Sequence, residues 1–201
     1  MPFIFKRLAL YLSIAAAFAA DKDQAFRPGP AASYPHKQTN AKVTIAADPY
    51  MSGEKVKVAF GKLDPYVYGV LPVLLVIQND SGQTLRLKDM KAEYVGPRGD
   101  RIPATPPSDV KYAKPPSRPT TIPRPVGIAT KGHKNPLDAW EIEGRALSAE
   151  MLPAGNSASG FVYFQSGLER GSTIYLSGIT EAATGKELLY FEIPIGEPLG
   201  Q

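Results

Sequence analysis

The residues that most often carry catalysis or bind metals are scarce in this chain of 201 residues. It has no cysteine and two histidines, His36 and His133. A structural zinc site usually needs three or four His, Cys or carboxylate ligands, so this composition predicts no metal. A serine hydrolase would have to use His133, but no G-x-S-x-G motif accompanies it. We therefore expect no catalytic residue, metal or cofactor, and a hydrolase using His133 is the least favoured alternative.

Four carboxylates surround a predicted helix: Asp138, Glu141, Glu143 and Glu150. Glycosidases place two carboxyl groups about 5–9 Å apart across a cleft, and residues 138 and 141 of one helix could meet that distance. The dipole of a helix also favours carboxylates in its first turn without any catalytic role. We prefer this second interpretation, in which the four residues form a charged helix face.

The candidate binding region is a basic, proline-rich stretch at residues 98–134, with eight Lys and Arg, two Asp and eight prolines. Proline fixes φ and removes a backbone donor, so we expect an exposed, partly polyproline II loop without a central strand or a helix. Such a loop could bind an anionic surface, although a long connection kept soluble by charge and proline is the simpler interpretation. The candidate ligand-binding residues are Tyr112, Lys114, Arg118, Arg124, Lys131 and Lys134.

Two short motifs have both a functional and a local interpretation. Arg98-Gly99-Asp100 spells an adhesion tripeptide, but it also fits a β-turn with glycine at a permissive position. Asn79-Asp80-Ser81 fits the N-x-[ST] acceptor rule for glycosylation and equally fits a hairpin turn. We favour the turn for both motifs.

The elements that must position these residues are mostly strands. Apolar and polar residues alternate in short segments separated by Gly and Pro turns, which is typical of a β-sandwich or a barrel. The apolar run Val70–Gln78 predicts a strand buried on both faces at the centre of a sheet. Residues 43–45 begin another predicted strand, and the remaining strands are predicted at 56–60, 84–87, 91–95, 160–165, 173–179 and 187–193. We expect an all-β, immunoglobulin-like β-sandwich.

One short helix is expected at residues 136–150, with Asn135 as its N-cap and Pro136 as its first residue. We expect it to pack Trp140 and Leu147 on the sheet. The inward-facing residues of this helix and of the strands should form the core. The predicted core residues are Val56, Val58, Leu74, Val76, Leu87, Trp140, Phe161, Tyr163, Ile174, Leu176, Leu189 and Phe191.

The first residues have the layout of a secretory signal peptide. Lys6-Arg7 precedes an apolar run from Leu8 to Phe18, and Ala17-Phe18-Ala19 fits a cleavage site after Ala19. No later segment is apolar for long enough to span a bilayer. We expect a signal peptide at 1–19, a disordered tether at 20–41, a β-sandwich domain at 42–195 and a tail at 196–201. We therefore expect the protein to be exported to the periplasm or the extracellular space.

The stretch Leu152-Pro153-Ala154-Gly155-Asn156-Ser157-Ala158-Ser159-Gly160-Phe161-Val162-Tyr163-Phe164 resembles the "L-P-x-G-x-x-x-x-G-F-x-x-F" pattern of bacterial telokin-like, immunoglobulin-like extracellular domains. Those domains precede it with a "V-x-N" strand end, which Val76-Ile77-Gln78-Asn79 matches loosely. The resemblance covers residues 69–195. It implies a β-sandwich that is exported or exposed on a surface, and it implies no catalytic residues. The Pro-rich stretch 98–134 departs from the pattern.

The sequence therefore predicts an exported, non-enzymatic binding or scaffold module. An envelope polysaccharide-binding module, using the tyrosines or residues 98–134, is the main alternative. The partner would be a protein or an anionic envelope polymer. Nucleic acid is not expected, because removing Lys6 and Arg7 with the leader lowers the formal charge from +4 to +2.

Overall fold

The apolar run after Val70 forms the central strand of the first sheet. The computed structural model describes residues 26–51, 53–113 and 135–196. Within them, β3 (Leu71–Asn79) pairs antiparallel with β2 (Val43–Pro49) on one side and with β8 (Ser157–Phe164) on the other, and β1 (Lys37–Asn40) completes the order β1-β2-β3-β8. Every residue of β3 except Gln78 is buried, which confirms the predicted burial on both faces.

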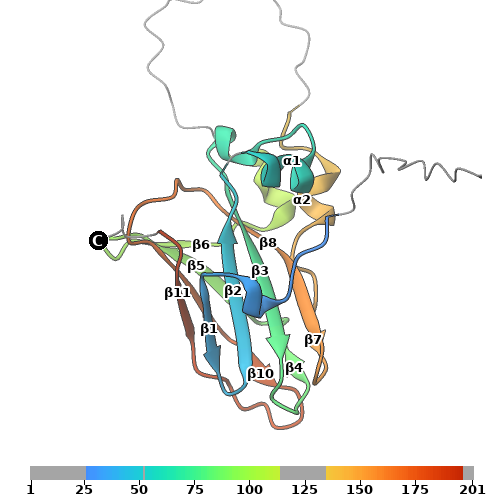
Figure 1. Cartoon of the computed structure of the whole chain (residues 1–201). Helices are drawn as coiled ribbons and strands as arrows, with labels where there is room; N and C mark the ends of the chain where they lie inside the picture. Colours follow the sequence, from blue (N-terminus) through green and yellow to red (C-terminus); the bar gives the residue numbers. More distant parts are fainter. Residues whose placement is uncertain (1–25, 52, 114–134, 197–201) are drawn as a thin grey trace, which may run out of the picture.

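A second four-stranded sheet faces the first. Its order is β11 (Phe191–Pro194), β9 (Thr173–Ser177), β5 (Lys91–Val95) and β6 (Arg101–Pro103), all antiparallel. Three two-residue strands, β10 (Thr180–Glu181), β4 (Leu85–Arg86) and β7 (Met151–Leu152), form a small third sheet at one end (Figure 1). This all-β sandwich with few short helices confirms the predicted fold class.

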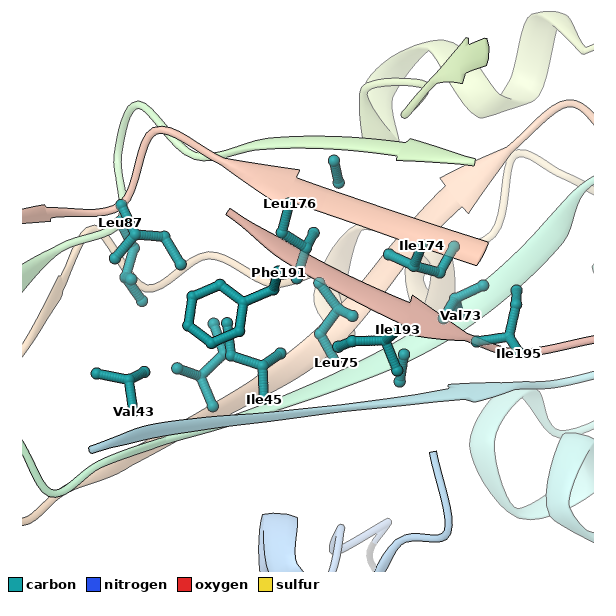
Figure 2. Close-up of a cluster of buried hydrophobic side chains, with 14 of the residues drawn as sticks. Val43, Ile45, Val73, Leu75, Leu87, Ile174, Leu176, Phe191, Ile193 and Ile195 are labelled. Carbon is teal, nitrogen blue, oxygen red and sulfur yellow. The ribbon is translucent and has the colours of Figure 1, made fainter. Parts of the chain in front are cut away.

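The pleat of β3 divides its side chains between two cores. Leu71, Val73, Leu75 and Ile77 point towards the second sheet, where they pack in one cluster with side chains of β9 and β11. Figure 2 shows Val73 and Leu75 beside Ile174, Leu176, Phe191 and Ile193 in this cluster. Leu74 and Val76 belong to a separate cluster on the other face of the sheet.

Short helices cover that other face at one end of the sandwich (Figure 1). Its cluster centres on Phe161, whose ring lies 4.7 Å from Phe60, 5.0 Å from Tyr50 and 5.4 Å from Phe26 between centroids. The covering elements are η1 (Ala31–Ser33), α1 (Glu54–Phe60), η2 (Pro65–Tyr68), η3 (Pro107–Tyr112) and α2 (Trp140–Gly144). This layer holds most of the exposed residues discussed below.

The strand predicted at 56–60 is wrong, because these residues form α1. Val56, Val58 and Phe60 alternate along the sequence, but Val56, Ala59 and Phe60 are also spaced as one face of a helix. That face is buried in the structure, whereas Val58 is 43% exposed. The ambiguity of a short apolar pattern therefore explains the error.

The helix expected at 136–150 is shorter than predicted. It ends at Gly144, after which the chain lies along the outer edge of β8: Phe161 N donates to Arg145 O at 2.8 Å and Leu147 N donates to Phe161 O at 3.0 Å. Within the helix Ile142 is buried and Trp140 is 69% exposed, so the core assignment of Trp140 is wrong. Leu147 does pack on the core between the sheets.

The described part of residues 98–134 is not a simple loop. Residues 101–103 form β6, and residues 107–112 form η3, which buries Val110. The prolines occupy positions that tolerate the loss of a backbone N–H: Pro103 ends an edge strand, and Pro107 begins a helix whose first N–H groups have no acceptor within the helix. Residues 114–134 lie outside the described residues.

Two other boundaries in the structure differ from those predicted. The sheet begins at β1 and the preceding chain packs Ala31 and Phe26 on the helical layer, so the part of the tether range from residue 26 onwards is structured. The last predicted strand begins at Phe191, and Leu189 is 75% exposed in the connection before it. Leu189 and Val58 are thus wrong core assignments like Trp140. The other nine predicted core residues are buried.

Side chains of β1 close one side of the sandwich. The Gln38 Oε1 atom accepts a hydrogen bond from Glu192 N, and Asn40 Nδ2 donates to Tyr190 O at 2.9 Å. Because β1 is the outer strand of one sheet and β11 that of the other, these bonds join the neighbouring edges of the two sheets.

The resemblance motif builds the corner where β3 ends. Asn79 is fully buried; its Nδ2 donates to Gln83 O at 2.8 Å and to Leu152 O at 3.0 Å, and its Oδ1 accepts from Ser81 N and Ser81 Oγ. Gly155 adopts φ +75° and donates its N–H to Asn79 O at 2.7 Å. The amide of Asn79 is thus fully engaged and inaccessible, which agrees with a turn rather than a glycosylation site.

Gly160 of the same motif is needed for a close approach between two chain segments. A Cβ on Gly160 would lie 2.4 Å from Leu147 Cα and 2.5 Å from Leu147 N, both backbone atoms. No side chain fits there, so glycine allows residues 145–147 to lie against β8. The residues of the resemblance motif therefore have a structural role.

Candidate functional surface

Of the six predicted binding residues, the structure describes Tyr112, at the end of η3. Its side chain is 72% exposed, and Lys111 Nζ lies 5.5 Å from the centroid of its ring. Lys114, Arg118, Arg124, Lys131 and Lys134 lie outside the described residues, and so does His133. Their predicted role therefore stays a prediction.

Tyr112 belongs to a larger exposed surface that sequence reasoning missed. Val67 of η2 is 66% exposed and Trp140 of α2 is 69% exposed, although both are large apolar residues. Pro136 joins them, because it lines one hollow with Val67 and a second hollow with Trp140. We call Val67, Tyr112, Pro136 and Trp140 the helical-end surface.

Local hydrogen bonds fix the elements that carry this surface. Asp64 caps η2 by accepting the N–H of Tyr66 at 3.1 Å, and Pro65 occupies the first position of that helix. Asn135 Oδ1 accepts the N–H of Leu137 at 3.0 Å, while its Nδ2 donates to Lys111 O. Asn135 thus ties the segment before α2 to η3, next to Tyr112.

The ring of Trp140 lies over the backbone of its own helix. A Cβ on Gly144 would lie 3.1 Å from Cε3 of the indole, so the ring covers this glycine. The guanidinium carbon of Arg145 lies 5.9 Å from the Trp140 ring and 5.0 Å from the Phe26 ring. Arg145 Nε is buried and has no hydrogen-bond partner, so aromatic rings supply much of the environment of this guanidinium.

A groove of about 390 Å³ opens between the two sheets at a different place. On one side the chain crosses between the sheets: Ala104 N donates to Ala92 O, and Thr105 N donates to Tyr163 O. Apolar residues dominate its walls, which include Leu87, Met90, Ala92, Ala104, Leu147, Ala149 and Val162. At the rim Lys88 and Glu150 approach to 3.9 Å with both side chains exposed.

The exposed face of the second sheet has its aromatic rings already stacked. The ring of Tyr175 lies 5.3 Å from that of Tyr190, next to β11, and 4.6 Å from the Arg101 guanidinium on β6. Because β11 is next to β9 on one side and β6 lies beyond β5 on the other side, these neighbours approach Tyr175 from opposite directions. Tyr175 therefore offers little free ring surface for a sugar.

The residues considered for catalysis or metal binding lie in different parts of the structure. His36 is described, and its carbonyl oxygen accepts the N–H of Ala47 at 3.0 Å. Asp138 and Glu141 line the hollow beside Trp140, whereas Glu150 lies at the groove. Among residues 26–51, 53–113 and 135–196, no group of three or more His, Asp and Glu could hold a metal ion.

The Arg98-Gly99-Asp100 tripeptide forms the turn between β5 and β6. Gly99 adopts φ +84°, and Gly96 N donates to Asp100 O at 2.8 Å. The carboxylate of Asp100 folds back over Gly96, within 2.7 Å of the position that a Cβ would take. Asp100 is exposed, but its carboxylate lies against its own turn, which supports the turn interpretation of the motif.

Burial shifts the ionisation of three tyrosines near the helical layer. Desolvation raises the pKa of Tyr163, whose hydroxyl donates to Ile142 O at 2.7 Å, and the nearby Arg145 charge opposes that shift. Desolvation likewise raises the pKa of Tyr50, with a further contribution from the Asp48 charge. The pKa of Tyr34 is also raised, mainly by burial. All three phenols stay neutral at physiological pH.

No family model and no curated protein matches the sequence. Among solved structures, ycdA of Bacillus subtilis, named as a lipoprotein, has 14% identity and a TM-score of 0.39 over 81% of this chain and 39% of that chain. The secreted protein MPT63 of Mycobacterium tuberculosis has 14% identity and a TM-score of 0.33 over 82% of this chain and 95% of that chain. At these scores the likeness assigns neither a family nor a function.

Within the described residues, no helix has the length and apolar character needed to cross a membrane.

Proposed function

We propose that the chain is an exported, non-enzymatic β-sandwich module that binds a protein partner through the helical-end surface. The observation that carries this proposal is the exposure of Val67, Tyr112 and Trp140. Their elements are linked, because α2 contacts η3, and Pro136 before α2 lines a hollow with Val67 of η2. Scattered single apolar residues on a surface need no explanation, but a group of them marks an interaction site. Trp and Tyr are also the residues most enriched at the energetic centres of protein interfaces.

Export is supported by the leader-like sequence of residues 1–19, and the compartment would be the periplasm or the extracellular space. Membership of the telokin-like, immunoglobulin-like domains is part of the same proposal. It is supported by the β-sandwich and by the structural corner that the resemblance motif builds around Asn79. N-terminal sequencing of the exported product should give Ala20 as its first residue.

Affinity capture with matched variants tests the binding surface. The exported form would be immobilised and exposed to envelope and secreted proteins of the host, in parallel with Val67→Ala/Trp140→Ala and with Leu189→Ala/Tyr190→Ala. The control pair is also large, apolar and exposed, but lies in the connection before β11.

A partner that uses the helical-end surface is retained by the wild type and by the control pair, and is lost from the first pair. Equal retention by all three forms would contradict the proposed surface. Retention of an envelope polysaccharide in place of a protein would favour the alternative module.

A further inference from the structure

The hollow beside Trp140 combines an exposed aromatic ring with negative charge. Its volume is about 540 Å³, and its six lining residues are Asn135, Pro136, Asp138, Ala139, Trp140 and Glu141. Two of the six are carboxylates and none is basic. Glu143, in the first turn of α2 like Glu141, is exposed and adds a third negative charge nearby. The charged side chains that line this hollow therefore favour a cation over an anion.

Trp140 already interacts with one guanidinium. Arg145 lies near this ring and that of Phe26, and its buried Nε has no hydrogen-bond partner. The negative face of an indole attracts cations, and Trp is the strongest such acceptor among the side chains. Because 69% of Trp140 remains exposed, the ring has free surface for a second positively charged group from outside.

The carboxylates determine which kind of ligand the hollow favours. A neutral sugar ring could stack on the indole without using the charge of Asp138 or Glu141. An anionic polymer would be repelled by both. A Lys or Arg side chain uses the ring and the carboxylates together, and its apolar stem could pack on Pro136 and Ala139.

We propose that this hollow binds an Arg or Lys side chain from a basic segment of the partner protein, over Trp140 and beside Asp138 and Glu141. The inference rests on the proposed function and deepens it, since it gives the chemistry of the partner. It also opposes the sequence-based expectation of an anionic polymer, for which residues 98–134 were the candidate site.

The chain offers a direct probe, because Trp140 is its only tryptophan. The fluorescence of the unmodified exported protein would be followed during titration with a hexa-arginine peptide, and with a hexa-citrulline peptide of nearly equal shape and no side-chain charge. We expect a saturable change in emission with arginine, weakened at high salt, and none with citrulline. Equal responses to the two peptides, or no response to arginine, would overturn the proposal.

Charge variants separate this hollow from general electrostatics. Asp138→Asn/Glu141→Gln should weaken arginine binding about fivefold to tenfold, because two exposed ion pairs are lost. Glu150→Gln/Glu192→Gln removes the same total charge elsewhere and should change affinity less than about twofold. Equal weakening by both pairs would overturn the assignment to this hollow, as would a response to cellohexaose but not to arginine. If titration fails while Val67→Ala/Trp140→Ala still loses the captured partner, the cation site is wrong and the proposed surface stands.

Discussion

Replacing Asn79 with alanine should destabilise the domain more than any other single change to a polar side chain discussed above. The substitution removes four side-chain hydrogen bonds, to Gln83 O, Leu152 O, Ser81 N and Ser81 Oγ. A neutral hydrogen bond contributes about 1 kcal/mol net, and the loss is larger when the abandoned partner is buried. Water can partly replace the bonds at the half-buried Ser81, but the bond to Leu152 O is buried. The expected loss is therefore about 3–4 kcal/mol.

Thermal unfolding followed by circular dichroism measures this loss. For a domain of this size, a change of 3–4 kcal/mol corresponds to a fall in Tm of roughly 10 °C. Asn79→Asp should be at least as harmful, because a carboxylate cannot donate to the two carbonyl groups and would bury a charge. Asn156→Ala is the matched control, since its side chain is exposed and its backbone makes the contact with Asn79. A Tm for Asn79→Ala within about 2 °C of the wild type would refute the reasoning.

Three further outcomes follow from the packing. Gly160→Ala should lower the Tm strongly because its Cβ would collide with the Leu147 backbone, whereas Gly167→Ala, whose Cβ would lie 3.6 Å from the Tyr66 hydroxyl, should be nearly neutral in the same assay. Ile142→Ala should lose about 2–4 kcal/mol in urea unfolding, and Trp140→Ala less than about 1 kcal/mol, because the first side chain is buried and the second is not. Stability should fall as the pH rises above about 10, because burial raises the pKa of Tyr50 and Tyr163 and the folded state then holds protons that the unfolded state has lost. Tyr163→Phe should flatten this fall in urea titrations between about pH 8 and 11; an unchanged slope would exclude Tyr163 as a contributor.

The sheets could be predicted from the sequence where the apolar pattern had a single interpretation. The run from Val70 is long, rich in β-branched residues and too uniform for one exposed face, so it had to be a central strand. The pattern around Val56 fits a strand or a helix equally well. What decides between them is the apolar face of β3 and β8, which needs a covering layer. That requirement comes from tertiary structure and is invisible in a window of seven residues.

The candidate surface was only partly predictable. Tyr112 was selected for its basic surroundings, and the structure places it in an exposed position. The core prediction for Trp140 rests on a helical stripe that it would share with Leu147, and this spacing outweighs a local signal. That signal was present: Asp138, Glu141 and Glu143 surround the tryptophan in the sequence, and Gly144 is the last residue of the short helix. Carboxylates on both sides of a lone aromatic residue indicate solvent rather than a core.

The bonds from Gln38 and Asn40 to β11 have a consequence for self-association. An outermost strand with free peptide groups invites another chain to add to it, and this is a common route to aggregates. Here polar side chains of one layer satisfy peptide groups of the other, so a passing strand finds fewer partners along this flank. Copies of this chain at high concentration would thus be less able to add strand to strand along this flank, and any lasting contact between them would have to form elsewhere.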